Sequence, residues 1–391
     1  MSMVQALGGD RFAAWLGGVL TLLAAACGQP SGPGTTTPTG AAHAAPCIVA
    51  TERGTRGGQL VLVGADGTRQ GDLTRATVVA VRDNSARVSP DGKWVVFAST
   101  RARGNMSQTS LWLVSSRVGE QPRRLTTGAS IDMHPVWMPN GSGIVYASQA
   151  APGQSFGLWH VALMKATGRP PIAIGEPRLL TRDANSSALH PTVSPNGRRV
   201  VYMRLSQDKK SSLWSVAIAA KASTPVAVTQ GPVDLTPTFS PDGKTIAFSS
   251  RDKGLSTHLF MINADGTGRR LVVEESLAAQ TGPRFSPDGR YLFATSLFRS
   301  LSTGKALYSA ISFVDLRESE PVLRSLHDPA TIEVNRLAPA VMPCTLDATV
   351  MLRNRRFREN LRDAFAEEVR RRVDLIRRNQ GTAPPVPPET P

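Results

Sequence analysis

The stretch Ser240-Pro241-Asp242-Gly243-Lys244 decides the fold, because a turn of this kind recurs along the chain. Proline fixes φ, the Asp side chain bonds the local backbone, and glycine accepts a positive φ, so the stretch predicts a tight turn. It is preceded by Thr236-Pro237-Thr238-Phe239 and followed by Ile246-Ala247-Phe248. These β-branched and aromatic residues predict the two strands of a hairpin.

The turn recurs at intervals of 46 to 56 residues, as Ser89-Pro90-Asp91-Gly92, Met138-Pro139-Asn140-Gly141, Ser194-Pro195-Asn196-Gly197, Ser240-Pro241-Asp242-Gly243 and Ser286-Pro287-Asp288-Gly289. Most units also contain a later apolar strand, such as Leu111-Trp112-Leu113-Val114, and close with a phrase such as Arg124-Leu125-Thr126. Four short strands in each unit are typical of a propeller blade.

The repeat units resemble TolB-like propeller repeats, and the resemblance covers about residues 47–344. Ala338 to Cys344 reproduces a sixth copy up to its turn, and then the pattern stops. The missing strands are found at the other end, in 47–50, 59–63 and 71–74. We therefore predict an all-β, six-bladed β-propeller whose last blade is shared by the two ends of the chain, which hides open sheet edges.

The alignment of this shared blade places Cys47 and Cys344 on either side of the missing hairpin turn. That separation suits a disulfide, and an exported compartment can oxidise it. We predict a Cys47–Cys344 disulfide that fastens the ring. The alternative is two unpaired thiols.

The N-terminus predicts export and a lipid anchor. Residues 1–26 have the pattern of a signal peptide, and Ala24-Ala25-Ala26-Cys27 resembles a lipobox that marks Cys27 for lipidation. Residues 27–46 contain the lipidated Cys and a Gly/Pro/Thr-rich flexible linker. Ordinary signal-peptidase cleavage after Ala26 is the alternative. Gly28 in place of Asp predicts sorting to the outer membrane, facing the periplasm; the cell surface and the outer face of the cytoplasmic membrane are alternatives.

The C-terminal region does not continue the strand-and-turn pattern of the repeats. Residues 345–380 predict a helical segment, because Phe357, Leu361, Phe365 and Val369 recur at helical spacing. The helix either docks on a blade edge or is offered to a partner or a second copy of the chain. Residues 381–391 form a Pro-rich tail that we expect to be disordered.

The chain has 391 residues and a formal net charge of +15. A basic surface could steer the protein to an anionic partner, whereas an Arg-rich composition would simply spread the charge over a solvated surface. No basic run is interleaved with aromatic residues, so no nucleic-acid partner is expected.

Motifs for catalysis are weak. Gly153-Gln154-Ser155-Phe156-Gly157 matches G-x-S-x-G but precedes a repeat strand, whereas a nucleophile elbow needs a strand, a turn and a helix. His134 and His190 occupy equivalent places just before the inner strands of neighbouring blades, and Asp234 lies near that place in the next. We interpret these three residues as a partner-binding rim at the channel mouth. We expect no catalytic residues, no bound metal and no cofactor.

The sequence therefore predicts a lipid-anchored envelope or periplasmic propeller that serves as a non-enzymatic scaffold for a protein or peptide. The resemblance is limited to the propeller, since the α/β domain that precedes it in TolB has no counterpart, and a Tol–Pal role does not carry over. The alternatives are a propeller lyase or hydrolase acting on an envelope saccharide or peptide, and a structural lipoprotein that self-associates through the C-terminal helix.

Overall fold

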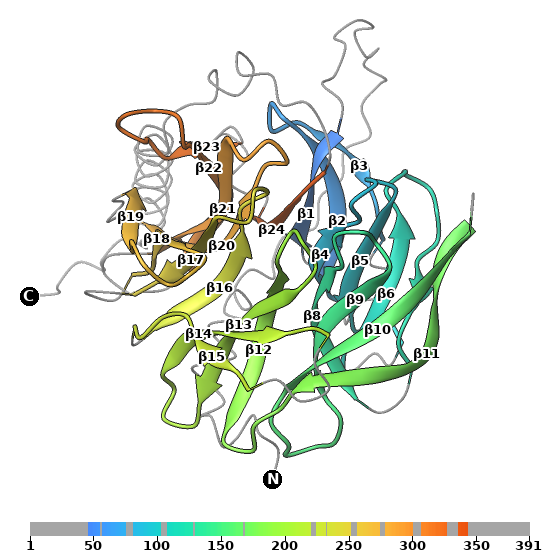
Figure 1. Ribbon diagram of the computed structural model, residues 1–391. Coiled ribbons are helices and arrows are strands. Elements are labelled where there is room, and N and C mark those ends of the chain that lie inside the picture. The colour runs from blue at the N-terminus through green and yellow to red at the C-terminus, as the bar shows by residue number, and fades with distance from the viewer. Residues whose placement is uncertain are drawn as a thin grey trace, which may run out of the picture.

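The computed structural model describes residues 46–342, apart from 55–56, 76–80, 103–107, 128–129, 167–168, 220–223, 232, 252–255, 274–277, 300–305 and 327–334. Within that part, six four-stranded antiparallel sheets are arranged around a central axis (Figure 1). The predicted six-bladed β-propeller is therefore confirmed. The predicted signal peptide, linker, C-terminal helix and tail lie outside the described residues. No helix within the described ranges is long and apolar enough to cross a membrane.

Five blades follow one another along the chain, each with its inner strand first. Blade 1 contains β4 (Asp83–Val88), β5 (Trp94–Ser99), β6 (Ser110–Ser115) and β7 (Arg123–Arg124). Blade 2 contains β8 (Ile131–Trp137), β9 (Gly143–Gln149), β10 (Gly157–Ala166) and β11 (Arg169–Thr181). Blade 3 contains β12 (Ser186–Val193), β13 (Arg199–Ser206), β14 (Ser211–Ala217) and β15 (Val226–Ala227). Blade 4 contains β16 (Asp234–Phe239), β17 (Thr245–Ser250), β18 (His258–Asn263) and β19 (Arg270–Val273). Blade 5 contains β20 (Ala278–Phe285), β21 (Tyr291–Arg299), β22 (Ala306–Asp315) and β23 (Arg324–Ser325).

The closing blade is assembled from both ends of the described chain, as the sequence predicted. Its inner strand is β24 (Asn335–Val341), which pairs with β1 (Pro46–Gly54), followed by β2 (Gly57–Gly64) and β3 (Arg69–Asp72). In the antiparallel ladder Ile48 lies opposite Val341, and the amide of Met342 donates to the carbonyl of Cys47 at 2.8 Å. The ring is thus closed by a β-ladder between segments at opposite ends of the chain.

Each Ser-Pro-Asp-Gly turn is held by a fixed set of hydrogen bonds. In blade 4 the Ser240 hydroxyl donates to Asp242 Oδ1 at 2.6 Å, and the amide of Lys244 donates to the same oxygen at 3.0 Å. The amide of Gly243, at φ 71°, donates to the carbonyl of Ser240 at 2.9 Å. The same Ser–Asp or Ser–Asn bond recurs in blades 1, 3 and 5. The side chains of the motif therefore fix each hairpin locally.

The turns also touch one another around the axis. A Cβ placed on Gly243 would lie 3.2 Å from Cδ of Pro195, which belongs to the turn of the preceding blade. The corresponding spacing is 3.5 Å from Gly289 to Pro241. Each of these glycines serves two purposes: it accepts a positive φ, and it leaves room for the proline of its neighbour.

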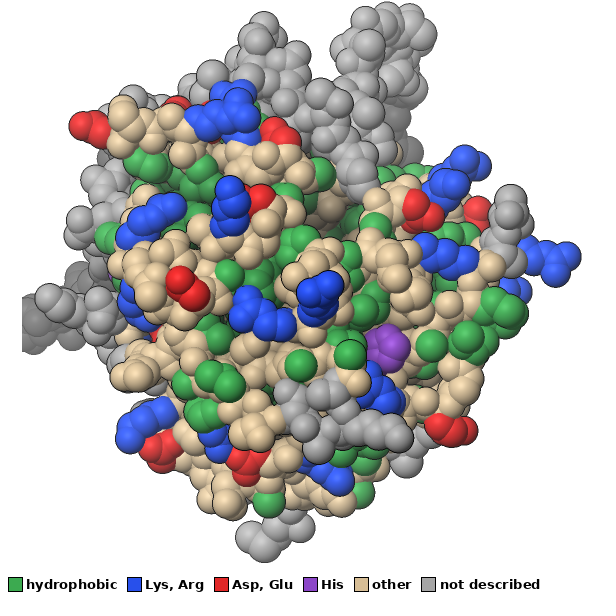
Figure 2. Space-filling model, viewed as in Figure 1, with side chains coloured by type: hydrophobic (Ala, Val, Ile, Leu, Met, Phe, Trp, Pro, Cys, Tyr) green, Lys and Arg blue, Asp and Glu red, His purple; other side chains and the backbone are tan. Residues whose placement is uncertain are grey.

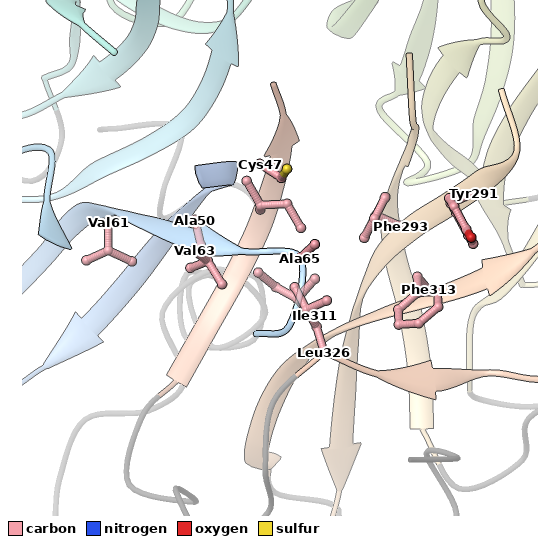
Figure 3. Packing of buried hydrophobic residues seen from close by; sticks show 11 residues of the cluster. Cys47, Ala50, Val61, Val63, Ala65, Tyr291, Phe293, Ile311, Phe313 and Leu326 are labelled. Atoms are coloured by element: carbon pink, nitrogen blue, oxygen red, sulfur yellow. The ribbon is translucent and has the colours of Figure 1, made fainter. Parts of the chain in front are cut away.

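The hydrophobic core consists of layers between neighbouring blades rather than one central core. Figure 3 shows the layer between the closing blade and blade 5, where Ala50, Val61 and Val63 face the aromatic residues Tyr291 and Phe313. The rings of Tyr291 and Phe313 meet edge to face at 5.9 Å. A fully buried aromatic or aliphatic side chain contributes about 1.5–3 kcal/mol, so such layers fix the angle between blades.

The contact between turns generates a prediction for Gly243→Ala. The new methyl group would force the left-handed conformation on an L-residue and press on Pro195, so we expect the free energy of unfolding to fall by about 2–3 kcal/mol. Gly153→Ala is the matched control, because Gly153 also has a positive φ (82°) but nothing lies within 4 Å of its added Cβ. Thermal unfolding of both variants provides the measurement. Equal loss of stability in the two variants would contradict the role of the Pro195 contact.

Candidate functional site

In five blades the inner strand has a residue with a positive φ, at the same distance before the turn. His134, His190 and Thr236 have φ values of 52°, 49° and 50°, and each sits at a register shift just before a proline. Ser85 and Gly282 occupy the same position in blades 1 and 5, with φ of 55° and 64°. A positive φ in a residue other than glycine costs of the order of 1 kcal/mol and tends to mark functional positions.

The structure brings His134 and His190 together. Their rings stack at a centroid distance of 3.6 Å with an interplanar angle of 28°. Nδ1 of His134 is buried and has no hydrogen-bond partner among the described residues. The two side chains meet because strands β8 and β12 belong to neighbouring blades and carry the bulge at the same place.

Burial keeps both imidazoles neutral. It lowers the pKa of His134 well below its usual value, and the charges of His190 and Arg87 lower it further. Burial, together with Arg87, lowers the pKa of His190 to about 3. At neutral pH the pair is therefore an uncharged aromatic stack beside Arg87.

Two positional expectations differ from the structure. The sequence placed the histidines just before the inner strands, but they lie within β8 and β12. Asp234 does not join them, because Thr236 occupies the equivalent position two residues later. His134-Pro135, His190-Pro191 and Thr236-Pro237 stand at the same distance before their turns, so the sequence itself places Asp234 two residues before the equivalent position.

Asp234 belongs to a structural repeat inside the blades. Its buried carboxylate accepts hydrogen bonds from Ser250 at 2.7 Å and from Arg269 at 3.1 Å. The same Asp–Ser bond, 16 residues apart, joins the first two strands in blades 1 and 2, between the pairs Asp83–Ser99 and Asp132–Ser148. This repeated spacing is a sequence signal that could have assigned Asp234 to the scaffold.

A second feature of the channel was not anticipated. A cavity of about 370 Å³, which we call the turn-side pocket, lies where the inner strands run into the Ser-Pro-Asp-Gly turns. Arg87, Arg284, Thr192 and Thr238 line it at corresponding places of four inner strands, together with the turn prolines 90, 195, 241 and 287. Arg87 and Arg284 each stand two residues before the turn serine, which is the only sequence signal for this pocket.

The geometry of the described residues does not support a nucleophilic serine in the G-x-S-x-G motif or a metal site. Ser155 donates a hydrogen bond to the carbonyl of Asp183, and Gly157 begins β10, so no helix follows as a nucleophile elbow requires. Within the described ranges, no group of three or more His, Cys, Asp or Glu side chains could hold a metal ion. Cys27 and Cys344 lie outside the described residues.

The radial blades, the turn repeat and the shared closing blade define a six-bladed β-propeller with a channel along its axis. Residues 175–306 match the family described as TolB beta propeller domain. This segment therefore carries TolB-like propeller repeats, and the resemblance found in the sequence is confirmed.

Solved structures support the fold. A putative TolB from Agrobacterium tumefaciens matches with 19% identity and a TM-score of 0.51, covering 76% of this chain and 98% of that one. A puromycin-hydrolyzing peptidase from Mycobacterium tuberculosis matches with 16% identity and a TM-score of 0.49, covering 73% of this chain and 44% of that one. An oligogalacturonate lyase from Vibrio parahaemolyticus matches with 16% identity and a TM-score of 0.41, covering 66% and 65%. No curated protein sequence matches. The neighbours thus include enzymes as well as TolB.

The neutral histidine pair predicts how stability depends on pH. In the unfolded chain a histidine takes up a proton near pH 6.5, whereas His190 stays neutral in the folded protein down to about pH 3. The unfolded state therefore binds more protons below pH 6.5, and stability falls as the pH falls. For His190 we expect a loss of about 2 kcal/mol at pH 5.

Unfolding midpoints measured between pH 7.5 and pH 5 test this expectation. The variant His134→Asn/His190→Asn should show a flatter profile than the wild type, while His160 remains in both proteins as an internal control. A wild-type profile as flat as that of the variant would show that the two imidazoles titrate normally in the folded state.

Proposed function

We propose that this protein is an exported, lipid-anchored β-propeller that binds an envelope protein or peptide in its central channel without catalysing a reaction. The observation that carries the proposal is the channel itself. Inner strands from five blades line the turn-side pocket, and no aspartate, glutamate or histidine is among the lining residues that the structure describes. A preformed recess without paired acid and base groups favours binding over catalysis.

The anchor is part of the same proposal. The propeller begins with β1 at Pro46, directly after the Gly/Pro/Thr-rich segment 27–46, which would serve as the tether from a lipidated Cys27. Gly28 favours the outer membrane and an orientation toward the periplasm. Residues 47–344 would then form the propeller, 345–380 a helix for a partner or for self-association, and 381–391 a free tail.

One observation favours a second candidate. His134 combines a strained backbone with a neutral imidazole whose Nδ1 has no partner among the described residues. Such a group could act as a general base, so a propeller lyase or hydrolase acting on an envelope saccharide or peptide is the alternative. This role would require an acidic partner that the ligand itself or a residue outside the described ranges supplies.

Capture of a partner from native membranes, followed by mass spectrometry, tests the scaffold role. We expect the wild-type protein to retain an envelope protein that His134→Ala/His190→Ala loses, because the stacked pair is the apolar, uncharged part of the channel surface. A chain ending at Cys344 should retain this partner, whereas loss with this truncation would assign binding to the C-terminal segment.

Controls within the same experiment separate the anchor from the channel. A Cys27→Ser protein should leave the membrane fraction and still bind the partner after detergent extraction. Capture that is indifferent to the histidine substitutions would refute binding at the channel histidines. Turnover of envelope saccharides by the wild type that disappears in the same variant would establish the enzyme instead.

We also propose the disulfide Cys47–Cys344. Cys47 is 2% exposed, and Met342, two residues before Cys344, donates its amide to the carbonyl of Cys47. A disulfide here would close a loop that includes nearly the whole propeller, worth at most about 5 kcal/mol on a loop-entropy model.

Mass spectrometry of unreduced proteolytic fragments should recover a peptide that links residues 47 and 344. The Cys344→Ser variant should unfold at a lower temperature than the wild type under oxidising conditions and at the same temperature under reducing conditions. A fragment linking Cys47 to Cys27, or free thiols at both 47 and 344, would refute the pairing.

A further inference from the structure

Two arginines face the turn-side pocket without an opposing carboxylate. Arg87 on β4 and Arg284 on β20 both line the cavity, and no acidic residue is among its described lining residues. Neither forms an ion pair within the described part of the chain. The Nη1 group of Arg87 donates to the carbonyl of Ala86 at 2.7 Å, and Arg284 makes the equivalent bond to the carbonyl of Pro283. Each guanidinium thus keeps most of its donors free.

Several other arginines of the propeller are paired with buried carboxylates. Arg101 pairs with the buried carboxylate of Asp83, Arg269 with Asp234, and Arg290 with Asp315. A buried charge without a partner is destabilising, and proteins generally pair such charges. Arg87 and Arg284 differ from these three arginines, because they line the pocket without an ion pair among the described residues.

Burial of the Arg87 and Arg284 guanidinium charges is destabilising in the protein without a ligand. Burial lowers the pKa of Arg87 to about 10, which reflects the loss of solvation around its guanidinium. Nε of Arg284 is buried and has no hydrogen-bond partner among the described residues. An anion in the cavity would supply the missing charge and the missing acceptor together.

The opposite wall of the pocket completes a site for an anion. Arg87 and Arg284 stand on the two blades that flank the closing blade, while Thr192 and Thr238 line the pocket from blades 3 and 4. Thr192 Oγ1 accepts a bond from the amide of Phe239 at 3.3 Å, so its own hydrogen is free to be donated. Valine, phenylalanine and proline side chains form the remaining surface.

The turn carboxylates Asp91, Asp242 and Asp288 are not among the described residues that line the pocket. Asp91, Asp242 and Asp288 each accept bonds from the serine hydroxyl and a backbone amide of their own turn. Arg87 and Arg284 are the charged side chains among the described residues that line the pocket.

We propose that the turn-side pocket is a carboxylate-binding site in which Arg87 and Arg284 together hold an acidic peptide residue or a small free carboxylate. A guanidinium offers parallel N–H donors that match the two oxygens of a carboxylate. A cavity of about 370 Å³ has room for one such group with a short apolar stem. The proposal rests on the channel-binding function proposed above and names the chemistry of its ligand, through residues other than the histidine pair.

Calorimetric titration of the purified mature protein tests the site with four probes: N-acetyl-tetraglutamate amide, N-acetyl-tetraglutamine amide, citrate and inorganic phosphate. We expect the tetraglutamate peptide or citrate to bind at least about tenfold more tightly than tetraglutamine and phosphate. Arg87→Met and Arg284→Met should each weaken binding at least about tenfold, because each removes a charge-assisted hydrogen-bonding group.

Arg270→Met is the matched control, since Arg270 is an exposed residue of the outer strand β19 and should leave binding unchanged. The unfolding temperature of Arg87→Met/Arg284→Met should equal or exceed that of the wild type, because two unpaired like charges are removed. If that variant does not fold, Arg87→Lys and Arg284→Lys keep the charge and should still weaken binding, because the planar fork is lost.

The two sources of a carboxylate give different results. Tetraglutamate binding more tightly than citrate identifies a peptide ligand, and the reverse identifies a small molecule. Absence of binding by both, tighter binding of phosphate, or binding unaffected by the double substitution would overturn the proposal. A partner captured in a histidine-dependent manner, with no carboxylate bound, would overturn this inference alone and leave the scaffold function standing.

Discussion

The hydrogen-bonded turn that joins the first two strands of each blade is the constraint on which the propeller depends. Ser240, Asp242 and Gly243 close one such turn through side-chain and backbone bonds that need no contact from other blades. The glycine then makes room for Pro195 of the neighbouring turn, which links the local hairpin to the ring. The hydrophobic layers between blades add the larger energy.

Because the turn is formed by residues that are contiguous in the sequence, the fold could be predicted well from the sequence. The turn motif located five blades, and the interrupted copy at Ala338 to Cys344 located the shared sixth. The site was predicted less completely. His134 and His190 were recognised because they repeat in register. Asp234 was grouped with them, although Thr236, which precedes a proline as the two histidines do, holds the equivalent position. The turn-side pocket was missed because Arg87 and Arg284 are brought together only by ring closure.

The channel concentrates the features that the scaffold itself does not require. Backbone strain at the bulge, a stacked pair of uncharged histidines and two arginines without counter-charges all lie on the inner strands. The space-filling view in Figure 2 shows arginine and lysine side chains spread over the visible face, with acidic side chains among them. The arrangement favours an interpretation in which the outer strands provide stability and the inner strands provide recognition.

The closing blade has a mechanical consequence for a tethered protein. The start of β1 lies beside the end of β24, since Ile48 faces Val341, so the two ends of the propeller emerge next to each other. Tension between an anchor before Pro46 and a load attached after Met342 would act first on the terminal Ile48–Val341 pair of this ladder. The remaining pairs would then separate one after another. A covalent bond from Cys47 to Cys344 would lie next to this terminal pair and bear the tension, so the hydrogen bonds between β1 and β24 would not be loaded.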